Sequence, residues 1–163
     1  MPRPIVARIH PDAVRHNLQL VRQKTPDSRV WAVVKANAYG HGIERIYPAL
    51  AEADGIALLD LDEAVRVREL GWKKPVLLLE GIFTPSDVAI ADEYGLTVAV
   101  HCTEQLDLLC AAQVKQPIPI NLKMNSGMNR LGFRPDEMRG DHCPMLGHPK
   151  ELAERLEAYR TGL

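Results

Sequence analysis

The sequence lacks the features that mark several classes of protein. Lysine and arginine number 20 against 21 aspartates and glutamates, and no block of like charge occurs in the 163 residues. Nucleic acids and anionic membranes attract a concentrated basic face, so neither is an expected partner. No apolar run approaches the roughly 20 residues that cross a bilayer, and the amino terminus does not resemble a secretion signal. These absences predict a soluble protein of the cytoplasm.

Cysteine is also scarce and forms no recognisable framework. Cys102, Cys110 and Cys143 are odd in number and include no C-x-x-C pair, so a disulfide-stapled fold is not expected. The segment "DHCPMLGH" brings His142 and His148 close to Cys143, but this spacing matches no standard zinc pattern. The sequence therefore predicts reduced cysteines and no metal site.

What is present is an alternation of short apolar runs with longer segments of helical spacing. Between the runs, apolar residues recur at i, i+3, i+4 and i+7, as on one face of a helix. Strands are expected at residues 30–34, 55–59, 76–79, 97–101 and 119–123. An earlier run, residues 5–9, is expected to form a separate leading strand.

Residues that favour helix starts and ends fall where this spacing predicts them. Asp60, Thr84 and Thr103 are typical N-caps, and Gly71 and Gly95 are typical of helix ends. Strands that are apolar on both faces and separated by helices form parallel sheets covered by those helices. The sequence thus predicts an α/β protein with about five parallel strand and helix units. A complete eight-unit barrel needs about 250 residues, so the chain would supply only part of one.

The segment 31–42, "WAVVKANAYGHG", ends an apolar strand on a single lysine. Lys35 then lies at the carboxyl end of the strand, where barrels and doubly wound folds build their sites. Such an edge can hold an amine in the neutral form that condenses with aldehydes, and pyridoxal phosphate is an aldehyde cofactor. Tyr39 could donate to its phosphate, and the small residues leave room for a flat ring. The alternative is a lysine that ends the strand and extends to water.

A second segment, "NLKMNSGMNRLGF" at 121–133, contains two more candidates. Arg130 is expected at the same carboxyl edge as Lys35, where its guanidinium could bind a phenolate or carboxylate oxygen. Lys123 would be an uncompensated buried charge inside a barrel unless it is paired or chemically neutralised. Spacing alone favours the alternative, a surface loop with one ordinary arginine.

Together these two segments resemble the alanine racemases, pyridoxal-phosphate enzymes of fold type III that interconvert L-alanine and D-alanine. "AVVKANAYGHG" is similar to the family's cofactor-lysine signature, and "LKMNSGMNRLGF" is similar to its second barrel signature. The resemblance covers about residues 3–138. It implies a TIM-type barrel segment over 1–138, followed by a divergent tail over 139–163 with a short helix.

The resemblance also implies a role for each candidate residue. Lys35 would bind the cofactor covalently and act as the base on one face of the substrate's α-carbon. Tyr39 would contact the phosphate, and Arg130 would bind the phenolic oxygen of the cofactor. Lys123 matches a position that is carbamylated in many members of the family.

After about Met138 the sequence departs from the family pattern. The remaining barrel strands, an arginine at the pyridine nitrogen and the carboxyl-terminal β-domain with its tyrosine base cannot be placed in it. We therefore expect a truncated alanine racemase of D-alanine and peptidoglycan biosynthesis that racemises alanine poorly or not at all and is soluble mainly as a homo-oligomer. The alternative is a pyridoxal-phosphate carrier or homeostasis module without racemase activity.

Overall fold

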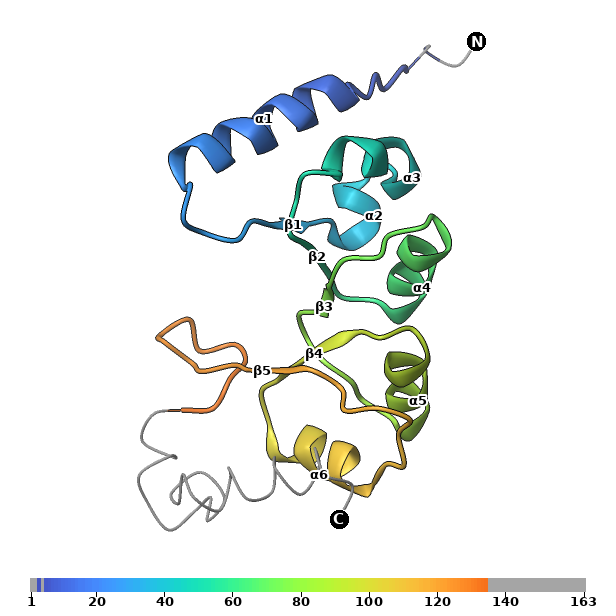
Figure 1. Cartoon of the computed structure of the whole chain (residues 1–163), viewed down its shortest axis with the longest axis vertical. Helices are drawn as coiled ribbons and strands as arrows, with labels where there is room; N and C mark the ends of the chain where they lie inside the picture. Colours follow the sequence, from blue (N-terminus) through green and yellow to red (C-terminus); the bar gives the residue numbers. More distant parts are fainter. Residues whose placement is uncertain (1–2, 4, 135–163) are drawn as a thin grey trace. The chain divides into compact units, whose positions relative to one another are not determined.

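The computed structural model describes residues 3 and 5–134, which fall into two compact units divided between Pro75 and Val76. Each unit is built from strands that alternate with helices (Figure 1). Unit 1 contains α1 (Pro11–Lys24), β1 (Trp31–Val33), α2 (Lys35–Tyr39), α3 (Ile43–Ile46), the 3-10 turn η1 (Tyr47–Leu50), β2 (Gly55–Leu58) and α4 (Leu61–Glu69). Unit 2 contains β3 (Val76–Leu78), α5 (Pro85–Glu93), β4 (Thr97–Val100), α6 (Thr103–Ala111) and β5 (Ile120–Leu122).

In unit 1, β1 and β2 form a parallel pair. Trp31 lies opposite Gly55 in the register. A Cβ atom at Gly55 would come within 2.5 Å of the Trp31 ring, so only glycine leaves room for the indole there. Helix α1, drawn in dark blue in Figure 1, packs beside η1 and α3.

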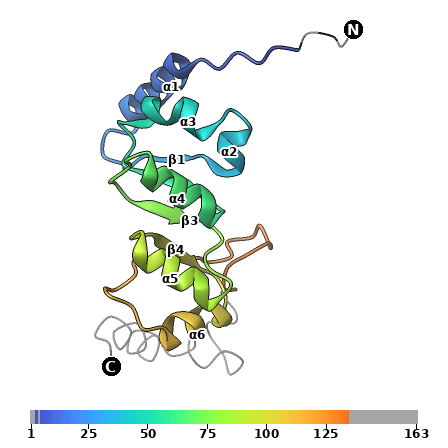
Figure 2. The same cartoon turned by 90° about the vertical axis from the view of Figure 1, so that its right-hand side faces the viewer.

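In unit 2, β4 pairs in parallel with both β3 and β5. Helices α5 and α6, which follow β3 and β4, contact each other (Figure 2). All four residues of β2 in unit 1 and the last three of β4 in unit 2 are buried, as expected for parallel strands that are covered on both faces. The five predicted strands and the α/β class are confirmed.

The helix ends confirm most of the predicted signals. Thr84 and Asp87 form a complete capping box at the start of α5, and Gly71 and Gly95 follow α4 and α5 with φ of 97° and 58°. The prediction for α6 is wrong by one residue. Cys102 is its N-cap, and Thr103 is already helical because the backbone turns one position earlier.

The predicted leading strand at residues 5–9 is also wrong. These residues have no regular secondary structure, and the Ile5 side chain is 92% exposed. A strand is stable only when a neighbouring strand satisfies its backbone N–H and C=O groups, and this run pairs with no strand among residues 3 and 5–134.

Other predictions fall outside the described residues. They are the boundary at residue 138, the short helix of the tail, and the cluster that contains Cys143. Among the residues the structure does describe, no helix is long and apolar enough to cross a membrane. Within the same residues, no group of three or more histidine, cysteine or acidic side chains could hold a metal ion.

Candidate active site

Lys35 stands directly after the last ladder bond of β1. The Val34 N–H donates to the carbonyl of Ala57 on β2 at 2.8 Å, which extends the pairing one residue beyond β1. Val34 is buried and Lys35 is half-buried. The amine is therefore carried by a backbone position that the β1–β2 pair fixes, at the carboxyl end of β1.

The segment labelled α2, which begins at Lys35, is a left-handed turn and not an ordinary α-helix. Residues 36–39 have φ between 51° and 55°, although none of them is glycine. This conformation costs roughly 1–2 kcal/mol for each L-residue, because the Cβ atom approaches the following carbonyl oxygen. Gly40 and Gly42 continue with φ of 82° and 88°. Four such residues in succession need support from other parts of the chain.

That support comes from hydrogen bonds made by the backbone N–H and by the side-chain oxygen of Asn37. Its backbone N–H donates to Oε1 of Glu63, and its side-chain Oδ1 accepts from the Ile43 N–H at 3.0 Å. The Gly40 N–H closes the turn by donating to the carbonyl of Ala36 at 3.0 Å. Sequence reasoning anticipated the small residues here but missed both the handedness and the role of Glu63.

The turn leaves space beside the exposed part of its backbone. Ala36 and Gly40 are exposed, and a Cβ atom built on Gly40 would meet no atom within 4 Å. Tyr39 is 59% exposed. An aldehyde cofactor with a flat ring and a phosphate needs three things from a site. They are an amine for the aldehyde, a hydrogen-bond donor for the phosphate and open backbone beside the ring, and the half-buried lysine, the accessible phenol and the open turn provide them. These residues of unit 1 fit pyridoxal phosphate.

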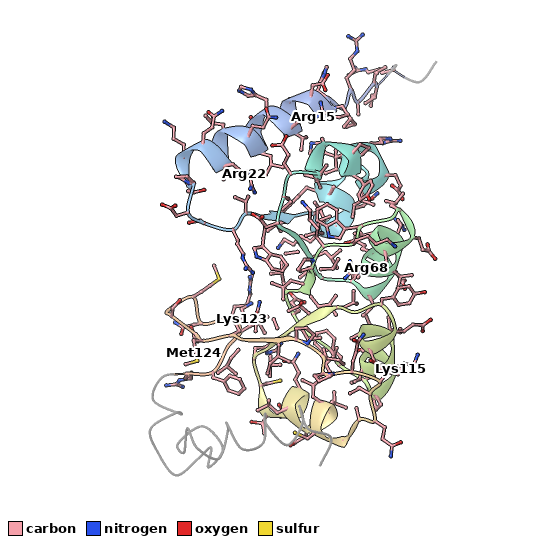
Figure 3. The ribbon with its side chains drawn as sticks, viewed as in Figure 1. Arg15, Arg22, Arg68, Lys115, Lys123 and Met124 are labelled. Carbon is pink, nitrogen blue, oxygen red and sulfur yellow. The ribbon has the colours of Figure 1, made fainter. Side chains whose placement is uncertain are left out.

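In unit 2, Lys123 directly follows β5 and is labelled in Figure 3. Its N–H donates to the Val100 carbonyl at 2.8 Å, and its carbonyl accepts from the Phe133 N–H at 2.9 Å. The half-buried Nζ lies 3.5 Å from the carbonyl oxygen of Leu79, which makes a long hydrogen bond. No described carboxylate forms an ion pair with Lys123. The structure thus leaves its charge largely uncompensated by the described side chains.

Arg130 is exposed on a loop that closes back on the end of β5. The Asn125 N–H donates to the Phe133 carbonyl at 2.9 Å, and Asn125 Oδ1 accepts from the Asn129 N–H at 3.0 Å. A Cβ atom at Gly132 would lie 2.7 Å from Asn125 N, so the loop closes tightly only with glycine there. An open pocket of about 550 Å³ lies against this loop, and Arg130 is part of its lining.

A buried glutamine ties together the loops that follow β3 and β4. Gln105, 2% exposed, donates through Nε2 to the carbonyls of Glu80 at 2.8 Å and Ile82 at 3.1 Å. Its Oε1 accepts from the His101 N–H at 2.9 Å. Gly81 lies under this amide with φ of 79°. The sequence pattern gave no sign of this network, because the residues that Gln105 joins lie on two loops.

The nearby thiol does not qualify as a nucleophile. Burial raises the pKa of Cys102, and the neighbouring carboxylate of Glu104 raises it further. A thiol must ionise to attack, so this environment makes Cys102 a poorer nucleophile than an ordinary cysteine. Among the candidates from the sequence, Lys35 and Tyr39 lie together in unit 1, and Lys123 and Arg130 lie together in unit 2. That Lys35 and Arg130 share one edge stays a prediction.

Parallel strands that alternate with helices, with the candidate lysines at the carboxyl ends of β1 and β5, define an α/β protein of the barrel class. The family model for the alanine racemase N-terminal domain matches residues 9–153, and the chain belongs to this family. Its strand and helix units are part of the family's TIM-type barrel.

Three similar proteins illustrate the relationship. An alanine racemase from Acidovorax sp. (strain JS42) is 61% identical over 99% of this chain and 49% of its own length. The biosynthetic alanine racemase of Pseudomonas aeruginosa superposes with a TM-score of 0.75 and 42% identity, over 85% of this chain and 39% of that one. A histidine racemase from Leuconostoc mesenteroides subsp. sake gives a TM-score of 0.65 and 30% identity, over 76% and 34%. The chain therefore spans about half, or less, of the length of the relatives it matches.

Proposed function

We propose that this chain provides the pyridoxal-phosphate-binding part of an alanine racemase, which interconverts L-alanine and D-alanine. The observation that carries the proposal is the left-handed turn at residues 36–39, directly after Lys35 at the end of β1. A conformation this costly is kept where the geometry of a site requires it. Membership of the alanine racemase family supports the interpretation of this turn as part of a pyridoxal-phosphate site.

Each candidate residue has one task in this proposal. Lys35 would hold the cofactor by bonding to its aldehyde carbon, with loss of water. Once the substrate's own amine has taken that bond, the released Lys35 amine would move a proton on one face of the substrate's α-carbon. Tyr39 donates its hydroxyl to the phosphate, and Arg130 donates to the phenolic oxygen. The neutral amine of Lys123 would add carbon dioxide and lose a proton to form a carbamate, which replaces its positive charge with an anion that could pair with Arg130. When bound, pyridoxal phosphate supplies the electron withdrawal that acidifies the Cα–H bond.

The wider setting is part of the same proposal. The enzyme supplies D-alanine for cell-wall peptidoglycan, works in the cytoplasm and assembles as a homo-oligomer. Support comes from the family match and from the bacterial alanine racemases to which the chain is similar.

A titration followed by two assays tests this function. The purified protein and its Lys35→Ala variant are titrated with pyridoxal phosphate while the visible absorbance is recorded. Each is then given L-alanine or L-histidine, and the D-enantiomer is measured. We expect a visible band and slow D-alanine formation, both absent from Lys35→Ala.

Three outcomes would contradict the proposal in different ways. A band without racemisation of either amino acid would favour the carrier alternative. Racemisation of histidine rather than alanine would show that the proposed substrate is wrong. Histidine is included because the chain is similar to a histidine racemase. Absence of the band would show that the protein does not bind pyridoxal phosphate in the proposed way.

A further inference from the structure

Glu63 is a buried carboxylate whose partner lies far away in the sequence. It is the third residue of α4, its exposed fraction is 8%, and Asp60 is the N-cap of that helix. The spacing Asp60-x-x-Glu63 is that of a capping box, in which the glutamate would accept the N–H of the N-cap residue. In the structure the Asp60 side chain makes no capping bond, and Glu63 Oε1 accepts the N–H of Asn37 instead.

This bond reaches the centre of the left-handed turn. Asn37 is two residues after Lys35, and its N–H has no place in a β-ladder, because β1 has already ended at Val33. Without Glu63 that N–H would have to find water or another partner, and the turn would lose a support at its second residue. The bond joins segments 26 residues apart, so it fixes the turn relative to α4.

The other carboxylate oxygen of Glu63 indicates that this residue positions the turn rather than stabilising the fold. Oε2 is buried and accepts no hydrogen bond from the described residues. Burying such an oxygen without a partner is unfavourable, and an apolar side chain of similar size would avoid that cost. A position optimised for stability alone would not hold a carboxylate here.

We infer that Glu63 is a positioning residue for Lys35, which it serves by holding the left-handed turn through the Asn37 N–H. The inference rests on the proposed function, since it takes Lys35 to be the amine that binds pyridoxal phosphate. It adds to the candidate site a residue that need not touch the cofactor.

The test compares Glu63→Gln with Glu63→Leu. Glutamine keeps an acceptor for the Asn37 N–H, whereas leucine keeps the volume and removes the acceptor. For each variant we would measure the affinity for pyridoxal phosphate by visible absorbance, the melting temperature, and the hydrogen exchange of peptides that cover residues 35–42. Glu63→Asp, which draws the acceptor back by one methylene, replaces the leucine variant if that variant does not fold.

We expect Glu63→Gln to bind the cofactor nearly as the parent does. Glu63→Leu should bind it about ten- to a hundredfold more weakly, because a small misplacement of the reacting amine is costly. Its melting temperature should not fall, and exchange over residues 35–42 should accelerate. Adding Ala36→Gly to Glu63→Leu should restore part of the affinity, since glycine adopts positive φ without penalty and Ala36 is exposed.

Two results would overturn the inference. One is a leucine variant with unchanged affinity and unchanged exchange. The other is a loss of affinity that follows a fall in melting temperature and is not rescued by Ala36→Gly, which would make Glu63 an ordinary structural residue. If the parent protein binds no pyridoxal phosphate, the proposed function fails, and with it the part of this inference that concerns the cofactor amine. The exchange data then still report whether Glu63 holds the turn, so the two failures can be told apart.

Discussion

Arg22 on α1 donates to the carboxylate of Asp54, with 2.8 Å between Nη1 and Oδ2 (Figure 3 labels Arg22). The same Oδ2 accepts the Val30 N–H at 2.7 Å, just before β1 begins. Asp54 thereby connects the end of α1, the start of β1 and the approach to β2. These contacts fix the amino-terminal end of β1, and Lys35 follows the carboxyl end of the same strand.

The first prediction concerns acid stability. The Val30 N–H, and after it Arg22, hold the pKa of Asp54 below its ordinary value of 3.8. A carboxyl group with a lowered folded-state pKa stabilises the fold above its unfolded pKa, and this stabilisation is lost as the pH falls through the folded value. Asp54→Asn should therefore lower the melting temperature at neutral pH and flatten its decline below about pH 4.

Asp27→Asn is the matched control, because Asp27 is exposed and also carries a carboxylate in unit 1. Melting temperatures of both variants and the parent between neutral pH and strong acid decide the matter. An Asp54→Asn variant whose acid profile parallels that of the parent would show that Asp54 contributes nothing to the pH dependence.

The second prediction concerns the glycine beneath Gln105. In Gly81→Ala, the new Cβ would lie 2.3 Å from the Ala99 carbonyl oxygen and 2.5 Å from Gln105 Nε2, at a φ of 79°. Either the backbone or the buried amide must move, so we expect a loss of about 2–4 kcal/mol in the free energy of unfolding. Gly95→Ala also has positive φ, but its Cβ would meet no atom within 4 Å. It should cost only about 1 kcal/mol. Urea denaturation that ranks the two variants equally would contradict the steric argument.

The third prediction concerns the thiols. Burial raises the pKa of Cys102, whereas Cys110 is exposed on α6. In a Cys143→Ser background, iodoacetamide at mildly alkaline pH should alkylate Cys110 well before Cys102. Peptide mass spectrometry over time measures both rates in one sample. Equal rates, or faster reaction at Cys102, would show that its environment is not the one described.

The fourth prediction concerns Lys123. Among residues 3 and 5–134, its Nζ makes only a long hydrogen bond to the Leu79 carbonyl, and no carboxylate there forms an ion pair with it. Conversion to a carbamate removes that charge, so incubation with 13C-labelled bicarbonate should give a carbamate carbon signal in the NMR spectrum. Lys123→Arg, which keeps a cation that does not form a carbamate, is the control. A signal that persists in this variant would come from another amine.

Local signals predicted most of the fold. Two-faced apolar runs such as β2 and the capping box at Thr84 depend on residues close in sequence, so their patterns could be interpreted directly. The segment around Ile5 failed because a strand depends on a partner, and apolar composition alone does not provide one.

The candidate site shows the same contrast between features that depend on nearby residues and features that depend on distant ones. Lys35 could be placed at the end of a strand from sequence, because the apolar run stops there. The handedness of the next turn could not be predicted, because Glu63, which accepts the Asn37 N–H, lies 26 residues away and has the spacing of an ordinary helix cap. Asn37, Gly40 and Gly42 within six residues were the available signal, since asparagine and glycine tolerate positive φ best.

The most direct test of the account is to identify the amine that binds the cofactor. The protein is incubated with pyridoxal phosphate, reduced with borohydride, digested and mapped by mass spectrometry. The account predicts that the label is on Lys35, and that it is lost in Lys35→Ala without transfer to another lysine. A label on Lys24 at the end of α1, or on Lys115, labelled in Figure 3, would contradict the assignment of Lys35 and with it the role of the left-handed turn.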